Sequence, residues 1–279
     1  MKILVTGATG KIGSRFVPRL LQRGHNVRIL ARDEKKTELL KQLGAEIVVG
    51  DLLHPPTLPN AVQNMDAVIH LGAFFRGATD EQAKAVNLDG TLALAHAALK
   101  AGIQHFVFAS TNLVYGQGYS RPALEDDSVQ PTHTYPATKI AAEQALRELS
   151  EHYGFDLCIL RLAFVYGEND PHILETFSRL VNWHPAKRLH MVHHADVAQA
   201  LLRVIAAKGV SGIYNVADDA PISLSELRSF YKQPESSTAD DLPLLHPWEG
   251  IVNTMRIRDE LGFRPLYPSF YVAREAGTL

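Results

Sequence analysis

The feature that most constrains the fold is a glycine-rich turn close to the amino terminus. Residues 6–13 read TGATGKIG, and they stand between an apolar run, residues 2–6, and a segment with helical apolar spacing, residues 12–23. Glycines in a strand–turn–helix unit let a pyrophosphate approach the free N–H groups at the start of the helix. An ordinary tight turn is the alternative. The turn predicts a dinucleotide site formed by Gly7, Thr9, Gly10, Lys11, Ile12 and Gly13.

Short β-branched or aromatic runs alternate along the chain with longer helical patterns. Helical segments such as 12–23, 87–101 and 138–152 separate the runs. The strands are expected at residues 2–6, 26–31, 46–49, 67–71, 105–109 and 157–161. This repetition builds a parallel sheet with helices on both faces, and the continuously apolar strands suit a sheet covered on both sides. The sequence predicts an α/β fold with a doubly wound, Rossmann-type parallel sheet.

The strand–helix rhythm weakens after residue 167. Residues 169–192 and 218–279 are richer in Pro, His and polar residues, and they flank one return to the sheet at 212–216. We expect a dinucleotide-binding domain of residues 1–168 plus 193–217. The remaining residues, 169–192 plus 218–279, are expected to form a small interleaved C-terminal substrate subdomain.

Composition limits the partners of the chain. Among 279 residues, 28 Lys and Arg stand against 30 Asp and Glu, so the formal net charge is −2. This balance offers no basic surface for nucleic acid or for a membrane, and we find no apolar run of the roughly 18 residues that a membrane span needs. The single cysteine, Cys158, lies in an apolar run. We therefore expect a cytoplasmic protein that binds neither nucleic acid nor membrane.

Further motifs follow the glycine turn in a fixed order. They are GDL at 50–52, HLGA at 70–73, NLDGT at 87–91, STNLVYG at 110–116, YPATK at 135–139, RLAFVYG at 161–167, VHHADVA at 192–198 and RDELGFRP at 258–265. With the G-x-x-G-x-x-G spacing of the turn, the chain resembles extended short-chain dehydrogenases/reductases of the NAD(P)-dependent (sugar-nucleotide) epimerase/dehydratase family over nearly its whole length. The resemblance implies an NAD(P)-dependent oxidoreductase or epimerase. It also implies cofactor contacts from Asp51, Leu52, Leu71, Gly72, Ala73, Asn87 and Ala109.

Tyr135 and Lys139 are the candidates for the chemistry and for a contact with the cofactor ribose. Residues four apart share one face of a helix, so the Lys139 ammonium can approach the phenol. We expect Lys139, together with an oxidised nicotinamide ring, to lower the pKa of Tyr135 so that the phenol exchanges a proton while hydride moves. Thr111, at the end of the fifth strand, is the predicted partner of the substrate oxygen. Ser110 is the weaker candidate, and a turn-capping role is the alternative for Thr111.

The end of the second strand bears on the choice of cofactor. An NAD enzyme usually places Asp or Glu there to accept hydrogen bonds from the adenosine ribose, whereas this chain has Ala31 followed by Arg32. A guanidinium without a carboxylate favours a 2′-phosphate, so we predict NADP in preference to NAD. A pairing of Arg32 with Asp33 is the alternative.

The expected reaction is hydride transfer at a secondary alcohol or ketone carbon of a nucleotide-sugar substrate. A reductase of a smaller carbonyl compound that uses NADPH is one alternative, and a non-catalytic dinucleotide sensor is another. The chain has Phe164 where nucleotide-sugar binders of the family commonly carry Asn, and Arg161 either orients a substrate loop or pairs with a buried carboxylate. The candidate substrate residues are Phe74, Phe75, Asn112, Arg161 and Phe164. The candidate anion partners are Arg179, Lys187, Arg188, Arg256 and Arg258.

Two further expectations concern metals and assembly. A His-only cluster without Cys or placed carboxylates is usually structural, so no metal is expected at His190, His193 and His194. In the family, two helices from each subunit form a four-helix interface. We therefore expect a homodimer through the helices at 87–101 and 138–152, where Ala93, Ala97, Ala141 and Ala145 permit close approach.

Overall fold

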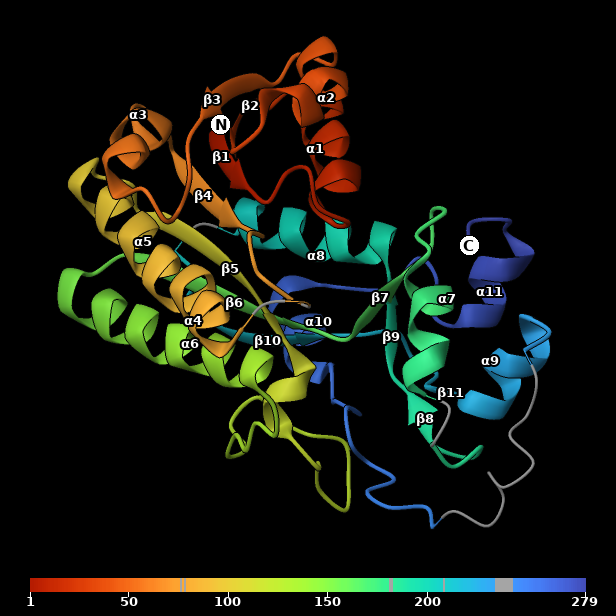
Figure 1. Cartoon of the computed structure of the whole chain (residues 1–279). Helices are drawn as coiled ribbons and strands as arrows, with labels where there is room; N and C mark the ends of the chain where they lie inside the picture. The colour runs from red at the N-terminus through yellow and green to blue at the C-terminus, as the bar shows by residue number, and fades with distance from the viewer. Residues whose placement is uncertain (76, 78, 181–182, 208, 234–242) are drawn as a thin grey trace.

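The computed structural model describes residues 1–75, 77, 79–180, 183–207, 209–233 and 243–279. A seven-stranded sheet runs through its centre in the order β10-β6-β5-β4-β1-β2-β3 (Figure 1). The strands are β1 (Lys2–Thr6), β2 (Asn26–Ala31), β3 (Glu46–Val49), β4 (Ala67–His70), β5 (His105–Thr111), β6 (Asp156–Leu162) and β10 (Gly212–Val216). Neighbouring strands pair in parallel throughout. The predicted doubly wound parallel sheet is confirmed.

Two groups of helices cover the two faces of this sheet (Figure 1). One face carries α1 (Gly13–Gln22), α8 (His194–Ala206) and α10 (Met255–Leu261); the other carries α3 (Leu58–Val62), α5 (Gly90–Lys100) and α6 (Thr134–Tyr153). The shorter helical segments are η1 (Glu34–Thr37), α2 (Glu38–Gln42), η2 (Pro55–Thr57), α4 (Asp80–Lys84), the π-helical η3 (Ala85–Asp89) and η4 (Asn112–Tyr115).

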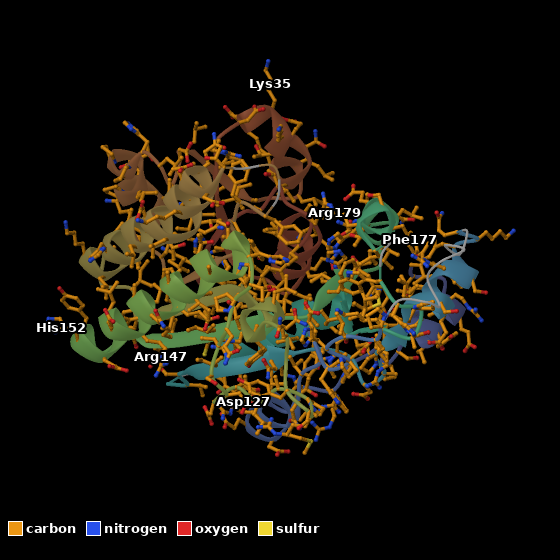
Figure 2. All side chains as sticks on the ribbon, turned by 60° about the horizontal axis from the view of Figure 1, so that its bottom comes forward. Lys35, Asp127, Arg147, His152, Phe177 and Arg179 are labelled. Carbon is orange, nitrogen blue, oxygen red and sulfur yellow. The ribbon has the colours of Figure 1, made fainter. Side chains whose placement is uncertain are left out.

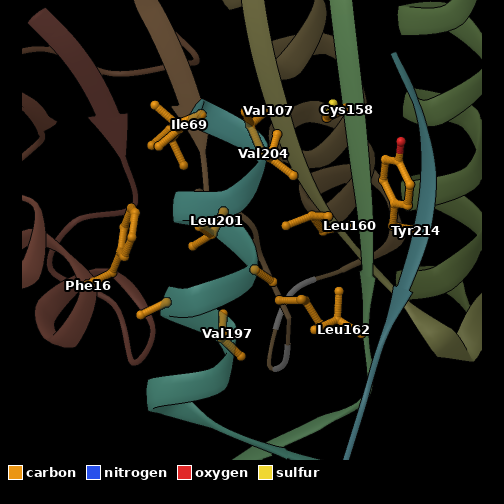
Figure 3. Close-up of a cluster of buried hydrophobic side chains, with 14 of the residues drawn as sticks. Phe16, Ile69, Val107, Cys158, Leu160, Leu162, Val197, Leu201, Val204 and Tyr214 are labelled. Carbon is orange, nitrogen blue, oxygen red and sulfur yellow. The ribbon is translucent and has the colours of Figure 1, made fainter. Parts of the chain in front are cut away.

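Strand residues alternate between two apolar cores, one on each side of the sheet. In β1, Ile3 and Val5 face the core under α1 and α8, while Leu4 faces the core under α3 and α5. Figure 3 shows the first core, with side chains of α8 lying between α1 and β6. Cys158 belongs to this core, and burial raises the pKa of its thiol to about 12. Because both faces are covered, the strands need apolar residues at every position.

The C-terminal part of the chain forms a smaller unit beside the sheet (Figure 1). Its elements are β7 (Phe164–Tyr166), α7 (His172–Thr176), η5 (Phe177–Arg179), β8 (Arg188–Leu189), β9 (Met191–His193), β11 (Ile222–Ser223), α9 (Leu224–Phe230) and α11 (Phe270–Glu275). A third apolar core unites them around Tyr166 and Phe270. Ile257 and Phe263, from the predicted substrate segment, pack instead into the core of the large sheet. Residues 234–242 of that segment lie outside the described residues.

The topology brings three strand ends to one edge of the sheet. β1 lies next to β4, with Thr6 beside His70, and β4 lies next to β5, with His70 beside Phe108. The glycine turn after β1, the loop after β4 and Thr111 at the end of β5 therefore share the carboxyl edge, where open α/β sheets bind ligands. Within the described residues, no helix combines the length and apolarity needed to cross a membrane.

Candidate functional site

The glycine turn is packed too closely for side chains. Gly7 has φ +68°, and a Cβ on it would lie 2.6 Å from the backbone nitrogen of Gly72. A Cβ on Gly13 would lie 2.3 Å from the carbonyl oxygen of Gly7. The first turn of α1 carries no acidic residue that would oppose an anion. The turn, the loop after β4 and the start of α1 therefore fit the pyrophosphate of a dinucleotide.

Lys11, in the same turn, reaches across to the small subdomain. Its Nζ lies 2.8 Å from a carboxylate oxygen of Asp170 and 2.8 Å from one of Glu175. Burial acts to raise the pKa of Asp170, but hydrogen bonds from His194 and Lys11 outweigh it and hold that pKa well below its usual range. The cofactor contact predicted for Lys11 stays a prediction. In the structure the Lys11 ammonium links the glycine turn to α7 through its ion pair with Glu175.

Tyr135 and Lys139 both lie in α6, which packs against β5 and η4. The Lys139 side chain is buried, with its Nζ 3.8 Å from the centre of the Phe108 ring, and this burial lowers its pKa to about 7. Burial also raises the pKa of Tyr135 to about 12. Within the protein alone, burial is the effect that shifts the pKa of Tyr135, and the lowering predicted from Lys139 and an oxidised nicotinamide ring together stays a prediction.

Ser110 and Thr111, two neighbouring residues at the end of β5, make different hydrogen bonds. Ser110 donates a short hydrogen bond to Glu143, so its proton is already committed inside the protein. The Thr111 oxygen accepts a hydrogen bond from the amide of Leu113 at 3.3 Å, which is the turn-capping geometry. That bond leaves the Thr111 hydroxyl proton to donate elsewhere. The arrangement favours Thr111 over Ser110 as the partner of a substrate oxygen.

Asn87 joins two parts of the site. It is fully buried in the π-helical turn η3, and its amide exchanges hydrogen bonds of 2.7 and 3.0 Å with the backbone of Phe74. The same amide donates to Thr138 at 3.0 Å, and Thr138 donates to the carbonyl of Tyr135 at 2.8 Å. Asn87 thus fixes the loop after β4 against the turn of α6 that carries Tyr135.

Of the two roles open for Arg161, the geometry favours pairing with a buried carboxylate. Its guanidinium lies 2.7 Å from Glu143 and also donates to Tyr115 and to the carbonyl of Glu125. Asn112, another candidate substrate residue, is buried and donates to the carbonyl of Gly250 at 2.6 Å. Both side chains use these polar groups within the protein.

Arg32 after β2 and Asp51 after β3 are predicted cofactor contacts. Ala31 is buried at the end of β2, and Arg32 is exposed directly after it. Asp33 accepts a hydrogen bond from the amide of Lys35 at 3.0 Å, and among the described residues no ion pair joins it to Arg32. Asp51 accepts from the amide of Leu53. The structure therefore leaves the Arg32 guanidinium at the surface beside the strand end.

The expected anion partners are mostly engaged with acids. Lys187 forms an ion pair with Glu249, Arg256 with Asp126, and Arg258 with Asp219. Arg188 lies over the Trp248 ring at 5.2 Å from its centre. Arg179 is exposed on η5 (Figure 2).

The three histidines considered for metal binding have three different partners. His190 donates a hydrogen bond from Nε2 to the backbone carbonyl oxygen of Asp218, 3.0 Å away. His193 bonds likewise to the carbonyl of Thr278 at 2.9 Å, and His194 to the Asp170 carboxylate at 2.8 Å. Each ring is held in place within its own surroundings.

A family model described as the NAD dependent epimerase/dehydratase family matches residues 3–217. The chain belongs to this family. It is an enzyme of this NAD(P)-dependent family, and two of its relatives are named as a ketoreductase and a dehydratase. The resemblance found in the sequence is confirmed.

Two curated relatives and one solved structure illustrate the family. A 4-hydroxy-2-methyl-3-oxo-4-farnesyl-3,4-dihydroquinoline-1-oxide ketoreductase of Stigmatella aurantiaca is 33% identical over 247 residues, covering 82% of this chain and 71% of the relative. A dTDP-D-glucose 4,6-dehydratase of Mus musculus is 29% identical over 257 residues, covering 81% and 70%. A short-chain dehydrogenase/reductase superfamily protein of Agrobacterium tumefaciens with bound NAD has TM-score 0.80 and 25% identity, covering 99% of this chain and 96% of that one.

Sequence reasoning missed several residues that build the site. His70 is fully buried between the hydroxyls of Thr6, at 2.5 Å, and Thr91, at 2.8 Å, and burial lowers its pKa to about 3. His172 and Thr138 were also missed. His70 and Thr138 each lie in a motif that carries the family resemblance, HLGA at 70–73 and YPATK at 135–139, whereas His172 lies in none of those motifs.

Proposed function

We propose that this protein catalyses NAD(P)-dependent hydride transfer at a secondary alcohol or ketone carbon, with Tyr135 as the acid–base group. The supporting observation is the placement of Tyr135 and Lys139 in one helix against the end of β5, where Thr111 stands. In carbonyl reduction the nicotinamide supplies the hydride, and the carbonyl carbon accepts it. Tyr135 gives its hydroxyl proton to the carbonyl oxygen, which Thr111 orients by a hydrogen bond.

Carbonyl reduction is the direction that we propose. Burial raises the pKa of Tyr135 to about 12, so the phenol carries a proton at neutral pH, as the proton donor in a reduction must. The relative in Stigmatella aurantiaca, named a ketoreductase, supports the same direction. Hydride transfer on a nucleotide sugar, as in an epimerase, is the second candidate, supported by the relative named a dTDP-D-glucose 4,6-dehydratase.

Replacing the phenol tests the proposal directly. Tyr135→Phe removes only the hydroxyl, so we expect turnover to fall by about a hundredfold or more while cofactor affinity hardly changes. Lys139→Met is expected to weaken both, since Lys139 also contacts the ribose in the proposed complex. Turnover assays and calorimetric titration with the nicotinamide cofactor measure the two effects. Equal activity of Tyr135→Phe and the unaltered protein would refute the mechanism.

A further inference from the structure

Three aromatic rings continue from Tyr135 into the small subdomain, and we call them the aromatic wall: Phe75, His172 and Phe164. The Phe75 ring meets the Tyr135 ring edge-on, with centroids 4.7 Å apart. His172 follows at 6.0 Å from Phe75, again edge-on, and its ring stacks on Phe164 at 4.2 Å with 10° between the planes. The wall thus links the loop after β4, α7 and β7, starting at the catalytic phenol.

The aromatic wall differs from the aromatic residues of the cores in its exposure. Phe75 is 42% exposed, and His172 and Phe164 are half-buried, with Phe164 also packed against the third core. Phe16 and Phe108 in the cores are at most 1% exposed. Contiguous aromatic rings with exposed area beside a reactive group are typical of a ligand surface, because water leaves the apolar part of that area favourably when an apolar ligand binds.

The wall is held in one arrangement by hydrogen bonds outside the rings. His172 donates from Nδ1 to the carbonyl oxygen of Val165 at 3.0 Å, which orients its ring on Phe164. The backbone of Phe74, next to Phe75, is held by Asn87. A surface already ordered in this way loses little conformational entropy when a ligand packs on it.

Most of the cations considered for a diphosphate are paired with acids, whereas Arg188 lies over the Trp248 ring and Arg179 is exposed. Lys11, the cation joined to α7, is paired with Asp170 and Glu175. Lys187, Arg256 and Arg258 of the C-terminal segments are paired with acids as well. A diphosphate group would have to displace carboxylates from these cations, whereas an uncharged ligand leaves the pairs intact.

We propose that the substrate is an uncharged, flat ring system that carries the reacting carbonyl or hydroxyl group and packs against the aromatic wall. This inference rests on the proposed function, since it places the reacting carbon beside Tyr135. It names the substrate class that the hydride-transfer site accepts. Ring faces and edges of the wall supply apolar contact area, and Tyr135 with Thr111 supplies the polar contacts to the substrate oxygen.

Steady-state kinetics with two probe ketones test the wall. α-Tetralone is a flat bicyclic ketone, and butanone is a small acyclic one. For Phe75→Ala and Phe164→Ala we expect the KM for α-tetralone to rise about tenfold, with kcat near that of the unaltered protein, because only contacts made equally in ground and transition states are lost. The KM for butanone is expected to change less than about threefold, since it is too small to span the wall.

Tyr153→Ala is the matched control. Tyr153 lies at the far end of α6 and is 57% exposed, so it is also an accessible aromatic residue but lies away from the wall. The Tyr153→Ala substitution should change the KM of neither α-tetralone nor butanone. An equal rise of both KM values in Phe75→Ala would overturn the proposal, because a disturbed fold affects both ketones alike.

A binding measurement separates failure of this inference from failure of the proposed function. Tyr135→Phe keeps the ring of residue 135 and the aromatic wall whether or not the hydroxyl transfers a proton. With cofactor present, α-tetralone should raise the Tm of Tyr135→Phe, and adding Phe75→Ala should remove most of that rise. Stabilisation by UDP alone, or no response to α-tetralone, overturns the flat-ring substrate even where Tyr135→Phe proves inactive.

Discussion

Arg161 on β6 and Glu143 on α6 form an ion pair inside the protein, with Nη2 and Oε2 2.7 Å apart and only 4% and 2% of the two side chains exposed. Glu143 lies one helical turn after Lys139, and it also accepts the hydrogen bond from Ser110. The pair therefore holds α6 against β5 and β6. Glu143 lies four residues after Lys139 on α6, and its other partner, Ser110, directly precedes Thr111 on β5.

Breaking this pair is expected to destabilise the fold. Arg161→Met leaves the Glu143 carboxylate buried without its cation, which costs about 3 to 5 kcal/mol. Urea unfolding of Arg161→Met against the unaltered protein measures the loss. Arg161→Met combined with Glu143→Leu should recover much of it, since no charge is then left buried. A single variant as stable as the unaltered protein would contradict the expectation.

Lys139 makes stability depend on pH. Burial lowers its pKa from 10.5 to about 7, so between these values the unfolded chain binds a proton that the folded protein does not. The contribution of Lys139 to stability therefore decreases as the pH falls from about 10.5 to about 7, and it stays constant below that. At pH 7 we expect Lys139→Met to be more stable by about 1 to 4 kcal/mol, a gain that vanishes near the upper value.

Unfolding free energies at neutral and alkaline pH check this dependence. Lys100→Met is the control, because Lys100 is an exposed lysine at the end of α5 and should show little change. A lower free energy of unfolding for Lys139→Met than for the unaltered protein at pH 7 would contradict the prediction. The contact of Lys139 with the Phe108 ring would then stabilise the fold by more than the desolvation of the ammonium destabilises it.

Arg32 is expected to set the cofactor preference. Calorimetric titration should show tighter binding of NADPH than of NADH, because the exposed guanidinium can form a charge-assisted contact with the 2′-phosphate. Arg32→Ala should reduce this preference by about 1 to 3 kcal/mol. Lys35→Ala, a nearby exposed cation, controls for a general loss of positive charge. Tighter binding of NADH would reverse the prediction.

The protein is expected to form a homodimer through α5 and α6. These helices pack on each other, and four alanines on them remain half-buried within the single chain: Ala93, Ala97, Ala141 and Ala145. Light scattering at micromolar concentration should give the mass of a dimer, and Ala145→Arg should convert it to a monomer by blocking close approach. Gln144→Arg, at an exposed position of the same helix, is the control. A monomer mass for the unaltered protein refutes the dimer.

Much of the fold and part of the site follow from local patterns in the chain. The strands at 2–6, 26–31, 46–49 and 212–216 lie where their apolar runs predict them. The glycine turn also lies where it was predicted, because Gly7 and Gly13 occupy positions that exclude a side chain. Tyr135 and Lys139 share α6, as their spacing indicates.

The sequence by itself determined the strands of the large sheet and several of its long helices, since burial on two faces and the 3.6-residue helical period set the apolar pattern of neighbouring residues. It did not show the short elements of the C-terminal unit, such as β7, β9 and α9. The tertiary structure alone decided which distant side chains meet. It paired Arg161 with Glu143, joined Ser110 to Glu143 by a hydrogen bond, and raised the pKa of Tyr135 by burial. It also brought Phe75, His172 and Phe164 into one row with the Tyr135 ring. Apolar periodicity records that a residue is covered, but the desolvation and the partner it meets depend on segments far away in the chain.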